Sequence, residues 1–308
     1  MKTNKHFQFA LILVAVLGLA LTGCKKEKND SNPDSTSLQQ LSKDEINVVA
    51  ASDEALNDVS MMLSGGQLKS TQLWPCHATI DSTSVINDTI TYYITYDGLN
   101  CPETIYRSGQ VEVKKQVGTH WGQPGATVTV KLIDFERTRV ATGRTVILNG
   151  TKIFKNVSGG HIWQLGYGVT TIEHRITGSV QATFEDNTTR TWNIARKRVF
   201  TGTPENLVMT VDGFGSEGEY NNLVLWGINR QGENFYIQIN QSVVHKQICE
   251  WNPVSGVKII SIPGDEKKAT ITYGYDDNNQ PVTGNECPTR YKVDWEKHNH
   301  SGTIFLPL

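Results

Sequence analysis

Four of the five cysteines are the side chains whose spacing most directly predicts chemistry. They are Cys76, Cys101, Cys249 and Cys287. Two uses compete for them, a bound metal ion and a pair of disulfides. Structural zinc sites place cysteines only a few residues apart, and no Cys-x-x-Cys occurs here. An even number of cysteines therefore favours two disulfides, for which three connectivities exist.

An internal repeat favours one of these connectivities. Thr89–Tyr92 and Thr270–Tyr273 share the letters Thr-Ile-Thr-Tyr, and each is followed by Tyr-Asp and then by Cys-Pro. In both units one cysteine precedes a predicted hairpin and its mate follows that hairpin. Antiparallel pairing brings the two ends of a hairpin together. The repeat therefore predicts the bridges Cys76–Cys101 and Cys249–Cys287.

Two other stretches carry side chains that can bind a cation. His298 and His300 can form half of a metal site, although their position between Trp295 and Ser301-Gly302 favours a solvated hairpin turn. The glycine-rich loop that contains Asp212, Glu217 and Glu219 offers carboxylates for calcium but matches no EF-hand spacing. We expect no cofactor, with calcium as the alternative, and no catalytic residue, because the Gly-x-Ser-x-Gly elbow and the phosphate-binding loop are absent from the sequence.

Aromatic side chains in predicted loops are the remaining candidates for ligand contact. Trp121, Trp163 and Tyr167 lie in glycine-rich connections. Exposed rings at such positions stack on sugars or anchor a protein partner. The alternative is that they cover the ends of the sheet.

The N-terminal region predicts export and lipid attachment. Lys2 and Lys5 precede an apolar run, Phe9–Leu21, that is too short to span a bilayer. Leu21-Thr22-Gly23-Cys24 looks like a bacterial lipobox, in which the cysteine is acylated, for example with palmitate. We expect a signal peptide over residues 1–23 and a lipidated flexible tether over 24–40. Lys25 directly after the acylated cysteine favours the outer membrane, on its periplasmic or its surface side.

One helix is predicted before the sequence changes to a β pattern. Lys43–Leu63 carries apolar residues at helical spacing, Ser42 fits an N-cap, and Gly65-Gly66 ends the pattern. We expect this helix within residues 41–66, either as a stalk or packed against a sheet. The formal net charge of −2 removes the simplest argument for nucleic-acid binding.

From residue 70 onward the chain alternates apolar and polar residues with period two, as in Thr127–Leu132. Turn signals recur about every ten residues, and no helical pattern lies between them. The sequence predicts an all-β domain over 70–308, an antiparallel meander, sandwich or elongated sheet of roughly 12–14 strands. The internal repeat allows two related halves, 70–200 and 201–308.

Two stretches resemble a group of lipoproteins of the Bacteroidota cell envelope. Tyr96–Val111 is similar to their aspartate–glycine–cysteine turn with its following arginine–serine–glycine strand start, and Cys249–Val257 to their second signature. Asn278–Glu286 is an insertion relative to that pattern. The resemblance implies location and architecture, and it transfers no activity to any residue.

The combined expectation is an envelope lipoprotein whose β domain has a non-enzymatic binding or structural role. Its partners would be the membrane, through the lipid on Cys24, and a glycan or an envelope protein, with no nucleic acid. Two alternatives stay open: a surface glycan-binding protein that uses the loop aromatics, and a hydrolase whose residues are dispersed in the sequence.

Overall fold

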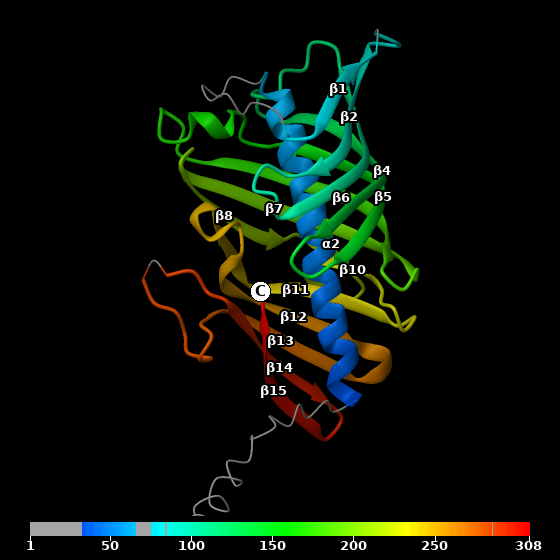
Figure 1. Ribbon diagram of the computed structural model, residues 1–308, viewed down its shortest axis with the longest axis vertical. Helices are drawn as coiled ribbons and strands as arrows, with labels where there is room; N and C mark the ends of the chain where they lie inside the picture. Colours follow the sequence, from blue (N-terminus) through cyan, green and yellow to red (C-terminus); the bar gives the residue numbers. More distant parts are fainter. Residues whose placement is uncertain (1–32, 66–74, 84, 285) are drawn as a thin grey trace, which may run out of the picture. The chain divides into compact units, whose positions relative to one another are not determined.

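The computed structural model describes residues 33–65, 75–83, 85–284 and 286–308. Asp34–Leu308 form one compact unit, in which a long helix, α2 (Pro33–Leu63), accompanies a single antiparallel sheet (Figure 1). The fifteen described strands are β1 (Ala78–Ser82), β2 (Thr89–Leu99), β3 (Ile105–Gln116), β4 (Ala126–Arg139), β5 (Arg144–Asn156), β6 (Ile172–Phe184), β7 (Thr189–Thr203), β8 (Asn206–Gly213), β9 (Gly215–Glu217), β10 (Tyr220–Ile228), β11 (Asn234–Lys246), β12 (Pro253–Ile262), β13 (Lys267–Tyr275), β14 (Arg290–Lys297) and β15 (His300–Pro307).

The strands follow one another in space nearly as they do in the sequence. The order runs from β1 to β7, continues with β10 and ends at β15, while β8 and β9 lie off this path. The predicted all-β class with one preceding helix is confirmed, and the alternative that applies is a single elongated sheet rather than a sandwich. Both predicted halves belong to this one sheet, and their relatedness stays a prediction.

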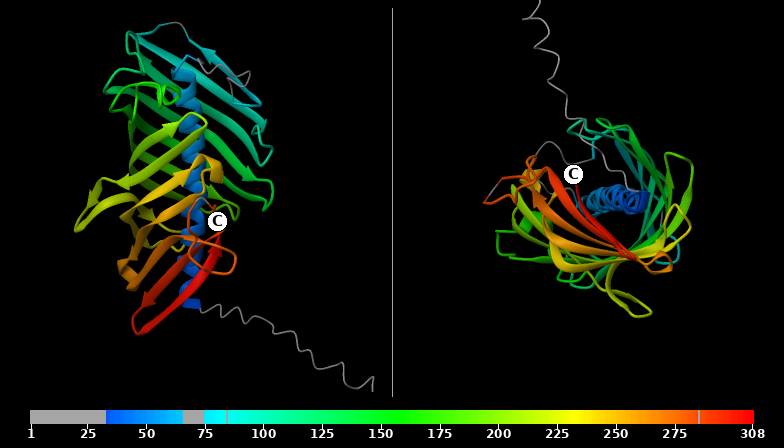
Figure 2. Two further views of the ribbon diagram at one scale, coloured as in Figure 1. Left: turned by 90° about the vertical axis from the view of Figure 1, so that its left-hand side faces the viewer. Right: turned by 90° about the horizontal axis from the view of Figure 1, so that it is seen from below.

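Helix α2 lies along the face toward which the sheet curves (Figure 2). We call that face of the sheet the inner face and the opposite one the outer face. One cross-strand row shows how the inner face meets the helix: its register partners include Val113, Val130, Lys152, Ile194, Leu225, Ile237, Ile260 and Trp295, and all of these are buried. The helix therefore takes the place that a second sheet has in a sandwich.

The start of the helix was predicted wrongly. Ser42 is a buried interior residue of α2, and its hydroxyl donates to the Tyr291 hydroxyl at 3.2 Å rather than capping the helix. The helix begins at Pro33, so the last part of the predicted tether is helical, and Leu38 in it belongs to the core. A proline as the first helical residue loses no hydrogen bond, because the first amides of a helix lack partners. No helix among the described residues is long and apolar enough to cross a membrane.

Two glycines on neighbouring strands permit the sheet to curve tightly around α2. A Cβ atom on Gly150 of β5 would lie 2.3 Å from the Ser179 carbonyl oxygen, and one on Gly178 of β6 would lie 2.3 Å from that of Thr151. Both glycines also have positive φ, +151° and +140°. Only glycine tolerates this approach of two backbones, which coils the sheet locally.

The two predicted disulfides are confirmed. Cys76–Cys101 spans the β1–β2 hairpin and Cys249–Cys287 spans the β12–β13 hairpin, with Cα–Cα distances of 5.2 and 5.3 Å. Each bridge closes the open end of its own hairpin, which is what the repeat predicted.

Candidate functional site

Acidic side chains of α2 pair with basic side chains that project from the inner face of the sheet. We call this set of contacts the helix–sheet ionic interface. On the helix it comprises Asp44, Glu45, Asp53, Glu54 and Asp58; on the strands it comprises Arg107, Arg137, Arg196, Arg198 and Lys258, with Arg230 added from the β10–β11 turn. The titratable groups that could do chemistry in this protein are concentrated here.

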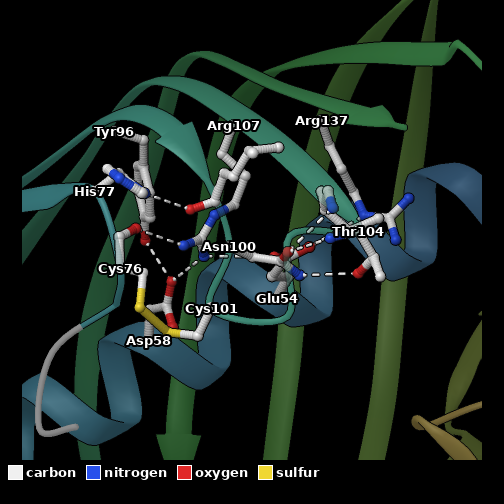
Figure 3. Close-up of polar contacts among 12 residues, drawn as sticks. Glu54, Asp58, Cys76, His77, Tyr96, Asn100, Cys101, Thr104, Arg107 and Arg137 are labelled. Atoms are coloured by element: carbon white, nitrogen blue, oxygen red, sulfur yellow. Dashed lines mark hydrogen bonds and ion pairs between the residues drawn. A yellow bond between two sulfur atoms is a disulfide. The ribbon is translucent and has the colours of Figure 1, made fainter. Parts of the chain in front are cut away.

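One end of this interface lies near the Cys76–Cys101 disulfide, and Arg107 of β3 makes most of the contacts there (Figure 3). Its Nη1 atom donates to Oδ2 of Asp58 at 2.9 Å and lies 3.4 Å from Oε1 of Glu54. Its Nη2 atom donates to the carbonyl oxygen of Cys76 at 3.0 Å, and its guanidinium lies over the Tyr96 ring. One buried arginine thus joins the helix, the sheet and the disulfide-bonded turn.

The disulfide-bonded turn is itself ordered by side chains that Figure 3 labels. Oδ1 of Asn100 accepts hydrogen bonds from the backbone amides of Thr104 and Ile105, at 2.9 and 3.0 Å. Nδ1 of His77 lies 2.9 Å from the carbonyl oxygen of Leu99. These contacts hold the Cys76 carbonyl oxygen within hydrogen-bond distance of Arg107. The Cys76–Cys101 disulfide thereby helps to position Arg107, which in turn pairs with Asp58 of α2.

Asp58 has the acid–base property that catalysis at neutral pH requires, but its surroundings serve structure. Burial raises its pKa to about 7, and the positive charge of Arg107 opposes that rise. The Tyr96 hydroxyl donates to its Oδ2 atom at 2.9 Å, and burial raises the pKa of Tyr96 well above its usual value. Both groups that hydrogen-bond this carboxylate, the Arg107 guanidinium and the Tyr96 hydroxyl, are themselves buried.

The middle of the interface holds more positive than negative charge. Asp53 accepts a hydrogen bond from Arg196 and lies 3.5 Å from Nη1 of Arg198. Burial alone would raise the pKa of Asp53, but the charges of Arg196 and Arg198 outweigh it, so the pKa is lowered. Arg198 is fully buried, and its guanidinium lies over the Phe154 and Phe200 rings. These aromatic faces supply part of the stabilisation that a second carboxylate would give.

Lys152 on β5 is the least compensated charge of this centre. Its ammonium donates to the Ser52 hydroxyl of α2, and no carboxylate of the described residues forms an ion pair with it. Burial lowers its pKa to about 7, which the negative charge of Asp53 partly opposes. The neighbouring His174 and His245 are neutral at neutral pH for the same reason: burial lowers the pKa of His174 well below its usual value and that of His245 to about 4.

Chemically, this arrangement can hold the helix against the sheet, because its acids and bases pair across elements that are far apart in the sequence. The described residues contain no group of three or more histidine, cysteine, aspartate or glutamate side chains placed to hold a metal ion.

Of the two interpretations of Trp121, the one in which it covers the end of the sheet core applies, and it is not available for ligand stacking. Its side chain is 2% exposed, packs on Phe154 and donates from Nε1 to the Ser60 hydroxyl of α2 at 3.2 Å. The loop that carries it folds over the end of the helix, because the indole has both an apolar ring to bury and a donor to satisfy. Trp163 is half-buried and stacks on His161, whereas Tyr167 is 71% exposed.

The alternative cation ligands do not converge among the described residues. Asp212 is held by Lys197, at 3.0 Å, and by the Ser242 hydroxyl. Glu217 and Glu219 lie in and beside β9, in a hairpin, and not around a common point with a third ligand. His298 pairs with Glu266 at 2.8 Å, and His300 begins β15. Cys24, the predicted lipidation site, lies outside the described residues.

The sequence analysis missed two sets of residues that the fold brings together. The first is the cationic set of the helix–sheet ionic interface. The second is an aromatic set on the outer face, in which the rings of Tyr220 and Tyr236 stack at 4.1 Å. A detectable signal for the first set was the pair Arg196 and Arg198, which stands between the apolar residues Ile194 and Phe200 at strand positions of the same parity.

Comparison with known proteins gives no relative from which a role can be transferred. No family model, no curated protein and no solved structure matches the chain.

Proposed function

We propose that this chain is a lipid-anchored protein of the cell envelope whose β domain has a non-enzymatic role in binding or structure. The observation that supports it best is the use of the acidic side chains of α2. Asp44, Glu45, Asp53, Glu54 and Asp58 all pair with cations of the sheet, so these carboxylates hold the helix in place and are not free to act on a substrate.

Two features support the envelope location. The disulfides Cys76–Cys101 and Cys249–Cys287 are of the kind that persists in oxidising compartments. In the sequence, only residues 25–32 separate Cys24 from the first residue of α2. On this proposal, the lipid anchor is followed almost directly by the helix around which the sheet is built, and the outer face is what the domain presents to partners.

Replacing Cys24 tests the anchor. We expect Cys24→Ala to abolish acylation and to release the protein from membrane fractions, because the thiol that would take the lipid is gone. Metabolic labelling with a palmitate analogue, combined with fractionation, measures both effects. Cys249→Ser with Cys287→Ser is the matched control, since it removes cysteines of the β domain and should leave labelling unchanged.

Labelled Cys24→Ala protein in the membrane fraction would rule out the anchor. Protease treatment of intact cells then assigns the side of the outer membrane: a protected domain faces the periplasm, and a cleaved one faces outward.

A further inference from the structure

Strands β8 and β10 share one position in the sheet, between β7 and β11. β7 pairs with β10 through Trp192–Ile194 and with β8 through Arg196–Thr203. β11 pairs with β10 through Asn234–Gln238 and with β8 through Val243–Lys246. Between β8 and β10 the chain leaves the sheet as a hairpin that contains β9. This hairpin lies outside the curve of the sheet, away from α2 (Figure 2).

A cavity of about 350 Å³ lies where β8 ends and β10 begins. Its side-chain lining is polar except for Ile239 and includes Lys197, Asp212, Asn222, Asn240 and Ser242. Lys197 follows Arg196, which faces the helix, so alternation along β7 places Lys197 on the outer face. The volume falls in the lower part of the range of small-ligand sites, about 300–1,000 Å³.

The polar groups of this cavity are set up to meet a neutral ligand. Lys197 and Asp212 pair at 3.0 Å, so their charges cancel, and the Ser242 hydroxyl fixes the other oxygen of Asp212. Asn222 and Asn240 are exposed, and neither amide has a polar partner among the described residues. Each of these amides offers both a donor and an acceptor to a ligand.

Aromatic rings lie on the hairpin that begins and ends at the cavity. Tyr220 of β10 stacks on Tyr236 of β11 with an interplanar angle of 8°. Trp226 is the register partner of Tyr236, and its ring would contact a Cβ atom on Gly215 at 2.8 Å, so it lies beneath the hairpin. Phe214, on the other arm, is 40% exposed. The residues that line the cavity include none of these rings, which lie on the hairpin and on the strands beneath it.

We propose that this outer-face cavity binds one end of a neutral glycan, with Asn222 and Asn240 hydrogen-bonding its hydroxyls, and that the glycan extends along the hairpin so that the Tyr220–Tyr236 pair, outside the cavity, contacts a further sugar ring. Flat ring faces match the C–H faces of pyranoses, amides match hydroxyls that both donate and accept, and cancelled charges favour an uncharged ligand over a charged peptide. The inference rests on the proposed binding role of the β domain and names its ligand class.

Calorimetric titration of the full lipidated chain in detergent tests this site. The probes are neutral oligomers of glucose, mannose and N-acetylglucosamine, with a heparin oligosaccharide as the anionic comparison. We expect binding of at least one neutral oligomer that Asn240→Ala and Asn222→Gly each weaken about tenfold, the loss that removing one good hydrogen bond from a complex produces. Glycine is chosen at position 222 because Asn222 has φ +53°.

We expect Tyr220→Ala to weaken binding as well. Asn187→Gly, which changes an exposed asparagine of φ +63° in the β6–β7 turn, is the control for Asn222→Gly, and Tyr106→Ala, which removes an exposed tyrosine of β3, is the control for Tyr220→Ala. Both controls should bind as the unchanged chain does. If no neutral oligomer binds at millimolar concentration, if only the anionic probe binds, or if Asn222→Gly and Asn240→Ala bind normally, the proposal is overturned.

These outcomes are separate from those that test the proposed function. A chain that is acylated and anchored but binds no glycan contradicts only the site. A bound oligosaccharide that is also cleaved supports the site and contradicts only the non-enzymatic role.

Discussion

Asp53→Asn is expected to lower the free energy of unfolding by about 3–5 kcal/mol, the usual cost of leaving a buried ion pair without one partner. Arg196 and Arg198 are 3% and 0% exposed, and Asp53 is the carboxylate that pairs with both of them. Asparagine keeps the shape of the aspartate side chain and one acceptor oxygen but removes its charge. The decrease in the free energy of unfolding therefore reports the electrostatic contribution of the pair. Urea titration followed by tryptophan fluorescence measures it.

Glu173→Gln is the matched control for this change. Glu173 pairs with Arg175 at 2.8 Å on the outer face, where the side chains are 27% and 49% exposed. Exposed pairs contribute about 0–1 kcal/mol. Should Asp53→Asn prove no more costly than Glu173→Gln, the pairing of helix and sheet would not be what stabilises α2.

Two lysines of the inner face are expected to respond oppositely to the same substitution. Lys258→Met should lower the free energy of unfolding by about 3–5 kcal/mol, because it leaves the carboxylate of Glu45 buried without its cationic partner. Glu45 is 1% exposed and accepts a hydrogen bond from Lys258 at 2.7 Å. Lys152→Met should instead stabilise the domain by about 1 kcal/mol or more, because an ammonium without a carboxylate partner is unfavourable to bury. The freed Ser52 hydroxyl can turn to a carbonyl of its own helix.

The pH dependence distinguishes the Lys152 variant further. Burial lowers the pKa of Lys152 to about 7 from an ordinary 10.5, so between these values the unfolded chain carries a proton that the folded chain has released. The free energy of unfolding therefore gains a contribution from Lys152 that rises with pH across this window. We expect this rise to disappear in Lys152→Met and to persist in Lys258→Met. Equal destabilisation by both variants, with unchanged pH profiles, would contradict the assignment.

The sequence predicted the parts of this fold that depend on local pattern. Alternation in segments such as Thr127–Leu132 identified strands, and the repeat around Thr89–Tyr92 and Thr270–Tyr273 identified both disulfides. The start of α2 was missed because Leu38 lies in a stretch of mostly polar residues, which shows no helical apolar pattern in the sequence. Leu38 is buried because the sheet covers it. Packing against distant strands, rather than intrinsic propensity, makes those residues helical.

The charged interface and the outer-face cavity depend on contacts that sequence spacing does not encode. Arg196 and Asp53 are 143 residues apart, and either one alone resembles a solvated side chain. Tyr220 meets Tyr236 only because β10 pairs with β11 through an irregular register. Both interpretations of Trp121, exposed or covering the end of the sheet, stayed open because nothing in its loop reveals that Ser60 lies beneath it.

The order of the contacts along α2 has a consequence for the order of folding. Asp58, near the end of the helix, pairs with Arg107, 49 residues later, whereas Ser42, near its start, contacts Tyr291, 249 residues later. Glu45 pairs with Lys258, 213 residues away, in agreement with this gradient. Contacts that close shorter loops form at lower entropic cost.

We therefore expect the C-terminal end of α2 to dock on the sheet first and its N-terminal end last, as successive strands are added to the sheet. Pulse-labelled hydrogen exchange during refolding would show amide protection around Asp58 before protection around Glu45, and simultaneous protection would contradict this order. The first turns of α2, around Leu38 and Ser42, are then the last part of the helix to be fixed, because their partners belong to the final strands of the sheet.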